Sequence, residues 1–223
     1  MSDAPFTTSL STEALADYVA RQMNAFFPDG DEGDAVEDVL GDALGRMEHC
    51  VRHVRMKGWW KDGNPRFNHL HTDQYAVFLY FLANAAYRRD VESVAAKAYA
   101  LNKALHGLDA FYEVELPGIF ALVHPVGTVL GRATYGDYFC AYQNVTVGSD
   151  LDNRHPVIGS GVVLYGGSRV IGDGRIGNNC LISAGCSLLG DSLPDNHIAL
   201  GQHPAVTAKP NRRNVIGDIF QDV

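Results

Sequence analysis

The 223-residue sequence has few of the features that mark secreted, redox-active or membrane-spanning proteins. It contains four cysteines, no two of which form a CxxC pair, and we expect all four to be small fillers of the core. Its longest apolar run, Ala76 to Leu82, is too short to cross a bilayer. Residues 1–11 lack the basic and apolar regions of a signal peptide, so we expect a cytoplasmic protein.

Basic residues are also in the minority. Lys and Arg number 18 against 26 Asp and Glu, which gives a formal net charge of -8. A surface of this sign disfavours nucleic acid and anionic membranes as partners. With 46% hydrophobic residues, a chain of this length can bury a full core and form one large or two small domains.

The second half of the chain contains a six-residue repeat. An apolar or aromatic residue recurs at Val123, Val129, Tyr135, Ala141, Val147, Ile158, Leu164, Val170, Ile176, Ile182 and Leu188. Four places further on, nearly every unit has a small or β-branched residue. This period is typical of short strands and turns wound around a prism, with three units to a coil. A β-sandwich rich in glycine turns is the alternative, but its strands do not hold one register over so many units.

The first half is predicted to be helical. Three- and four-residue spacing of apolar side chains, with capping and stop signals, predicts helices over Thr12–Phe27, Asp34 to about Lys57, Thr72–Arg89 and Val91–His106. The third of these is apolar nearly all round, so we expect it to pack against both its own domain and a neighbouring subunit. Residues 1–11 are expected to be a frayed terminus.

Two histidines four apart on the second predicted helix, His49 and His53, have the spacing of a shared metal site. No third ligand is apparent, and three arginines lie close by in the sequence. We therefore expect surface residues here and no metal.

Three segments carry a resemblance to a known family. Val123-His124, followed closely by Gly127, is similar to the His-Ala-Thr-Gly segment of the serine O-acetyltransferases, and Asn153 to Pro156 is similar to their Asp-Arg-His-Pro. Residues 144–148 resemble the stretch before their acceptor loop. The chain thus looks like a divergent branch of these hexapeptide-repeat acyltransferases.

The resemblance implies an α+β fold in which an α-helical N-terminal domain (1–110) precedes a left-handed parallel β-helix of hexapeptide repeats (111–210) and a C-terminal tail (211–223). Members of the family are usually trimers with active sites between subunits. A homotrimer or a dimer of trimers is therefore expected.

The implied activity is transfer of an acetyl group from acetyl-CoA to the hydroxyl of L-serine, in cysteine biosynthesis and without a metal. Such a transfer needs a base that removes the hydroxyl proton, and His124 matches the position of the family's catalytic histidine. In the family's arrangement His155 would hydrogen-bond the acceptor, and Arg154 would neutralise its carboxylate. In the family an upstream aspartate orients the base; counting back the same distance from His124 gives Asp109, and a local likeness to the family around residue 115 makes Glu115 a rival.

The acidic residues 149–153 interrupt the repeat just before Arg154 and His155, and we expect this segment to line the site. Coenzyme A is expected along small residues of the coil that match the family's pattern. The candidates are Gly148, Gly166 and Ala184, with Lys209 for the nucleotide phosphates.

Departures from the family keep other functions open. Val123 replaces an aspartate that helps the family hold its amino-acid substrate, so an acetyltransferase of a sugar or another small alcohol is an alternative. A non-catalytic scaffold is another. A zinc carbonic anhydrase on the same β-helix would need three converging histidines, which the coil does not offer. The family's last residue, isoleucine, docks into a sulfhydrylase, and Val223 predicts a weak contact of this kind at most.

Overall fold

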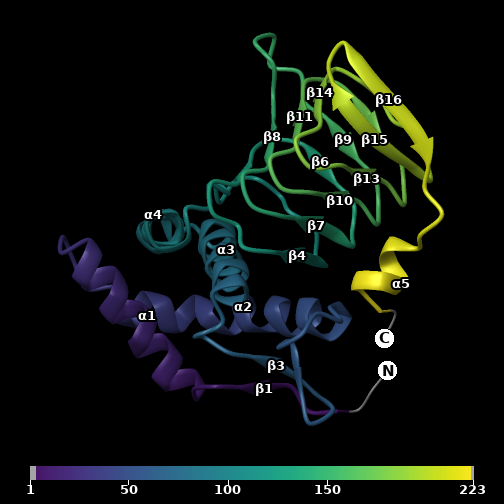
Figure 1. Cartoon of the computed structure of the whole chain (residues 1–223). Helices are drawn as coiled ribbons and strands as arrows, with labels where there is room; N and C mark the ends of the chain where they lie inside the picture. The colour runs from purple at the N-terminus through teal and green to yellow at the C-terminus, as the bar shows by residue number, and fades with distance from the viewer. Residues whose placement is uncertain (1–3, 222–223) are drawn as a thin grey trace.

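The computed structural model describes residues 4–221. Four helices form a layer beside a coil of parallel strands, which lies at the upper right in Figure 1. The helices are α1 (Thr12–Phe26), α2 (Gly33–His53), α3 (Thr72–Arg88) and α4 (Glu92–His106). The fold prediction, helices followed by a β-helix, is confirmed.

The helices begin and end close to the predicted positions because local signals fix them. The Ser11 hydroxyl accepts a hydrogen bond from the N–H of Ala14 and caps α1. Gly107 follows α4 in the left-handed conformation, with φ of 62°. Helix α2 ends at His53, earlier than predicted, since Val54 is extended and forms an isolated bridge with Phe220.

Helix α3 is covered within its own chain. Every residue from Gln74 to Ala86 is buried, and the helix packs against α2, α4 and strand β4 (Phe120–Leu122). The Tyr80 hydroxyl donates to the carbonyl of Val114 and accepts from the N–H of Leu116. The expectation that a neighbouring subunit covers this helix was therefore wrong.

The expectation of a frayed N-terminus was also wrong for its described part. Strand β1 (Thr7–Thr8) pairs in parallel with β3 (Asn64–Phe67), and β3 forms a hairpin with β2 (Trp60–Lys61). The Ser9 hydroxyl accepts from the N–H of His69 at 3.0 Å. These contacts tie the start of the chain to the loop before α3.

The coil has three faces of stacked parallel strands. The first face contains β4, β7 (Phe139–Ala141), β10 (Val163–Leu164), β13 (Leu181–Ile182) and β15 (His197–Gln202). The second contains β5 (Val129–Leu130), β8 (Thr146–Gly148), β11 (Arg169–Ile171) and β14 (Ser187–Leu189). The third contains β6 (Thr134–Tyr135), β9 (Val157–Ile158) and β12 (Arg175–Ile176).

Strand pairing gives the inward register. From Tyr135 onward the apolar residues predicted to point inward are buried, although Ser192, a predicted small inward residue, is exposed, and the first coil is displaced by one place. Leu122 pairs with Ala141, and Leu130 pairs with Val147, so these leucines replace Val123 and Val129 as the inward residues. Val129 is 37% exposed. The first turn is the cause, because eight positions separate Leu122 from Leu130, against six from Ala141 to Val147 in the next coil.

The C-terminal segment closes the coil and returns to the helices. Strand β16 (Ala205–Pro210) pairs antiparallel with β15, and the short helix α5 (Val215–Ile219) follows it. The N–H of Arg55 donates to the carbonyl of Ile219, the N–H of Gln221 donates to that of His53, and the Phe220 side chain is fully buried. We call residues 214–221 the C-terminal clasp. The predicted role of Val223 lies outside the described residues.

Candidate active site

Two edges of the prism carry the predicted site residues. The first corner joins the first face to the second, and the second corner joins the second face to the third. His124 follows β4 at the first corner, whereas His155 precedes β9 at the second. One chain therefore does not stack the two histidines on one edge.

A column of residues runs along the first corner. The register that pairs Leu122, Ala141, Leu164 and Ile182 places His124, Gln143, Gly166 and Ala184 at successive levels, each two residues beyond its strand. The N–H of Gly185 donates to the carbonyl of Gly166 at 3.0 Å, which continues the stacking through the turns. With coils about 4.8 Å apart, Ala184 lies about 14 Å from His124 along the axis.

The turn at His124 is wider than those above it. His124 has φ of 49°, a left-handed conformation that is uncommon for a residue other than glycine, and its side chain is exposed. Gly127 ends the turn with φ of 74°, and a Cβ there would lie 2.3 Å from Oδ1 of Asn144. Its N–H donates to the carbonyl of Gly107 at the end of α4. The helical domain therefore holds the far end of this turn.

The helical domain also holds the near end. The backbone N–H of His124 donates to Oδ1 of Asp73, in the first turn of α3, at 3.2 Å. Between them, α3 and α4 fix both ends of the turn that presents the imidazole. Asp73 was not among the residues predicted from the sequence, because 51 positions separate it from His124.

Neither predicted orienting carboxylate bonds His124 in the described chain. Asp109 accepts from the Tyr99 hydroxyl at 2.7 Å and from Nζ of Lys103 at 2.7 Å. Burial raises its pKa, but these two hydrogen bonds prevail and leave the pKa lowered. Glu115 is engaged by Arg88 and Asn84 instead.

The excursion before His155 forms a compact projecting loop, which stands out beside β8 in Figure 1. Oδ1 of Asp150 accepts from the N–H groups of Asp152 and Arg154, both at 3.0 Å. Hydrogen bonds from the Arg154 backbone and side chain lower the pKa of Asp150, so it stays ionised at neutral pH. At the tip, Leu151 is fully exposed.

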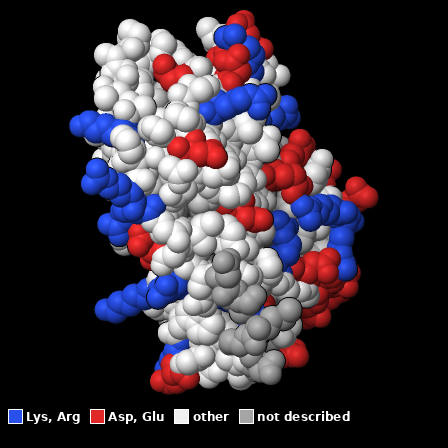
Figure 2. Space-filling view, turned by 90° about the vertical axis from the view of Figure 1, so that its right-hand side faces the viewer, with Lys and Arg blue, Asp and Glu red and all other residues white. Residues whose placement is uncertain are grey.

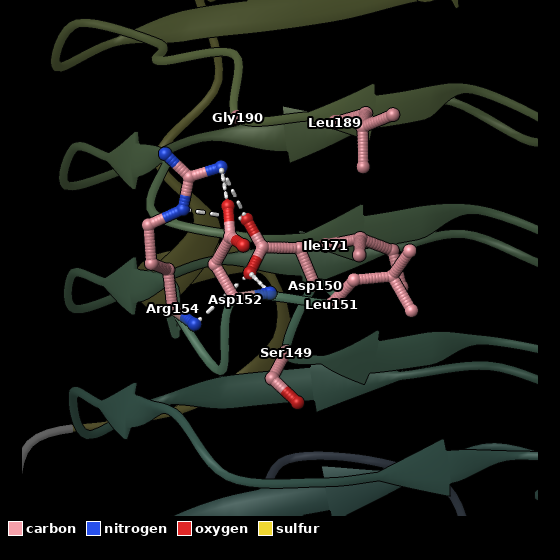
Figure 3. Close-up of a pocket in the computed structure, with 8 residues that line it drawn as sticks. All are labelled: Ser149, Asp150, Leu151, Asp152, Arg154, Ile171, Leu189 and Gly190. Carbon is pink, nitrogen blue, oxygen red and sulfur yellow. Dashed lines mark hydrogen bonds and ion pairs between the residues drawn. The ribbon is translucent and has the colours of Figure 1, made fainter.

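A cavity of about 480 Å³ lies against this loop. Figure 3 shows Arg154, Asp150 and Asp152 on one side of it, and three aliphatic side chains on the other. Its lining residues are Ser149, Asp150, Leu151, Asp152, Arg154, Ile171, Leu189 and Gly190. The predicted acceptor loop thus borders a pocket of the size that small-molecule sites have.

His155 is half-buried where the loop rejoins the coil. Its Nδ1 is enclosed and has no hydrogen-bond partner among the described residues. A hydrogen bond from this histidine to an acceptor would therefore use Nε2. Gly148 ends β8 just before the loop, and a Cβ there would meet nothing within 4 Å, so its surface is open to a neighbouring molecule.

The four residues expected to hold coenzyme A are not all on one edge. Gly166 and Ala184 share the first corner with His124, and a Cβ on Gly166 would lie 2.9 Å from Nε2 of Gln143. Gly148 lies at the end of the second face. Lys209 is exposed on β16, opposite Ile198, at the far end of the first face.

No group of three or more metal-ligating side chains occurs in the described part of the chain. No helix within residues 4–221 is long and apolar enough to span a membrane. On the face shown in Figure 2, acidic and basic side chains intermingle around an uncharged band, without a broad basic patch among the residues coloured there.

Comparisons with known proteins find similarity to serine acetyltransferases. The chain is 32% identical to the serine acetyltransferase of Synechococcus elongatus over 125 residues, which cover 54% of this chain and 51% of the relative. It is 28% identical to that of Helicobacter pylori over 139 residues, which cover 60% of this chain and 81% of the relative. The match thus spans about half the length of the cyanobacterial protein. No family model matches the chain.

Solved structures extend the likeness to nearly the whole chain. The serine acetyltransferase of Brucella abortus superposes with a TM-score of 0.71 at 19% identity, covering 91% of this chain and 85% of that one. The chain thus resembles serine acetyltransferases, in sequence over part of its length and in fold over nearly all of it. A Brucella abortus structure in complex with coenzyme A gives a TM-score of 0.67 at 16% identity, covering 92% of this chain and 84% of that one. A Neisseria gonorrhoeae structure in complex with serine gives 0.68 at 20% identity, covering 91% and 84%.

Proposed function

We propose that this chain transfers an acetyl group from acetyl-CoA to the hydroxyl of a small acceptor. L-serine is the first candidate for this acceptor. The observation that carries the proposal is the first corner, where the exposed His124 stands at the end of a column that also contains the small residues Gly166 and Ala184. Relatives named serine acetyltransferase, and solved structures of this fold with coenzyme A or serine, support it.

In this mechanism the acceptor hydroxyl attacks the thioester carbonyl directly. His124 removes the hydroxyl proton as the new C–O bond forms. The C–S bond then breaks, and the proton passes from the imidazolium to the departing thiolate of coenzyme A. No nucleophile from the protein is required.

The turn around His124 contributes orientation. Because Asp73 accepts from the backbone of His124 and Gly107 accepts from that of Gly127, the ring is presented by a turn that is fixed at both ends. Such preorganisation lowers the cost of reaching a reactive geometry. Asp109 is still proposed to orient the imidazole, and in that role its carboxylate would exchange Lys103 for His124.

The site is proposed to be shared between subunits of a homotrimer, alone or as a dimer of trimers. Since His124 and His155 lie at different corners, the first corner of one subunit would face the second corner of another. Acetyl-CoA would lie in that cleft against Gly148, Gly166 and Ala184, with Lys209 toward its phosphates. A contact of the C-terminus with a sulfhydrylase would be weak.

A thiol-release assay with acetyl-CoA tests the proposal. We expect His124→Ala to lower turnover by about 10²–10⁴, or roughly 3–5 kcal/mol of barrier, with little change in acetyl-CoA affinity. His197→Ala is the matched control, since His197 is at the start of β15, outside both corners. Full activity of the His124 variant would show that His124 is not the base, whereas a parent chain that releases no thiol with any acceptor would favour a non-catalytic scaffold.

An acceptor other than an amino acid is the second candidate. Val123, which stands where serine acetyltransferases have an aspartate for the substrate, is half-buried against the core and offers no charge to an amine. A panel of serine, homoserine, galactosides and maltose separates the two acceptor classes.

A further inference from the structure

The guanidinium of Arg154 is surrounded by carboxylates of its own chain. Its Nε and one terminal nitrogen both lie 2.7 Å from Oδ2 of Asp150. The same terminal nitrogen lies 3.3 Å from Asp152, and the other lies 3.5 Å from Asp173. Every nitrogen of the guanidinium thus faces a carboxylate. Figure 3 shows Arg154 with Asp150 and Asp152.

The charge around this arginine is negative. Three carboxylates against one guanidinium leave the group with a formal charge of -2. Asp150 is the tightest partner, with its side chain 14% exposed, and its other oxygen accepts the two backbone N–H groups that shape the loop. An incoming carboxylate would have to displace Asp150 and would be repelled by the two remaining aspartates.

The opposite wall of the cavity is apolar. The aliphatic side chains of Leu151, Ile171 and Leu189 face it, and Leu189 is 49% exposed. A wall of this kind contributes affinity only to a ligand with an apolar portion. The pocket therefore favours acceptors with more apolar surface than serine.

We propose that the acceptor is a hydroxyl compound without a carboxylate, either neutral or cationic, with an apolar portion. The inference rests on the proposed acetyl transfer and concerns only its acceptor. Arg154 organises the loop and is not the receptor for a substrate carboxylate. Val123 agrees with this, since the position beside His124 supplies no charge for an amino acid either.

The test compares L-serine with L-serinamide, which differ only in replacing the carboxylate by a neutral amide. We expect kcat/KM for L-serinamide to exceed that for L-serine by about tenfold or more at low ionic strength. The ratio should fall as salt screens the exposed aspartates. Asp173→Asn, which removes one negative charge without changing side-chain shape, should also lower the ratio. Asp17→Asn, on α1 and paired with Arg21, is the control and should leave the ratio unchanged.

Arg154→Gln separates the two roles of the arginine. A loop-organising residue should impair both acceptors alike, whereas a carboxylate receptor should impair L-serine alone. A ratio of one or below, or a loss confined to L-serine in this variant, overturns the inference while leaving acetyl transfer established. Release of coenzyme A with none of these compounds or sugars would instead refute the proposed function itself.

Discussion

Oδ1 of Asp73 lies 3.2 Å from the backbone nitrogen of His124 and accepts its N–H. The carboxylate belongs to the first turn of α3, and the histidine belongs to the first turn of the coil. The α-helical domain therefore reaches into the proposed site and fixes the residue that would act as base.

We expect Asp73→Ala to lower turnover by about ten- to a hundredfold, because the left-handed backbone of His124 loses its hydrogen-bond acceptor and the ring shifts. The net loss of stability should be small, about 1 kcal/mol, as for one hydrogen bond. Asp73→Asn keeps an acceptor oxygen in the same place and is the matched control. Equal turnover of the two variants, measured with folded protein, would contradict the role.

A second prediction concerns the column at the first corner. Ala184→Leu should raise KM for acetyl-CoA about tenfold or more, because the larger side chain occupies the path proposed for the coenzyme. Ala184 is exposed in the chain, so stability should not change.

Ser160→Leu is the control for this substitution. Ser160 lies in the turn between the third and first faces, away from the column. If both variants bind acetyl-CoA as the parent chain does, the coenzyme does not follow the first corner.

Subunit mixing tests the shared site. Inactive His124→Ala and inactive His155→Ala chains, mixed under conditions that exchange subunits, should regain part of the activity, because some clefts then contain both histidines. Sedimentation should show a trimer or a hexamer. A mixture that stays inactive while its subunits exchange would place both histidines of a site in one chain.

A fourth prediction follows from a buried histidine. Burial lowers the pKa of His106, whose Nδ1 is 2.8 Å from Oδ1 of Asn102, although nearby Asp73 opposes the shift. In the unfolded chain the imidazole of His106 has the ordinary pKa of about 6.5, so just below that pH it binds a proton that it does not bind in the folded chain. The free energy of unfolding should therefore fall as the pH drops from about 6.5 to the lowered pKa.

Denaturant unfolding at several pH values checks this behaviour. His49 and His69 also have lowered pKa values, mainly through burial, and act in the same direction. His106→Gln should make the dependence shallower than in the parent chain. An unchanged slope would show that His106 is not responsible.

The sequence predicted the repeating parts of the fold better than its exceptions. Six-residue spacing is imposed by the prism itself, so the apolar inward residues from Tyr135 onward could be identified. The first turn has two additional positions, and no periodicity reports an insertion at the start of a series. Val123 and Val129 were misplaced by one for that reason.

Contacts between distant segments could not be predicted from local patterns. The two-residue strand at Thr7 forms only by pairing with Arg66 and Phe67. The backbone of His124 is likewise held by a hydrogen bond to Asp73. The apolar surface of α3 showed that it is buried but not what covers it. The partners of Asp109 lie on the preceding helix, which counting along a family motif did not reveal.

The C-terminal clasp joins the end of the described chain to the end of helix α2. Nε2 of Gln221 donates to the carbonyl of Arg52, a contact between residues 169 positions apart. Contacts of such sequence separation must overcome the entropy of closing a long loop, and they slow folding. During synthesis on the ribosome, the end of α2 stays uncovered until residues 214–221 have been made. The nascent protein therefore leaves the end of α2, including the buried side chain of Val54, without the Phe220 side chain throughout synthesis of the β-helix, the interval in which association with other chains is most damaging.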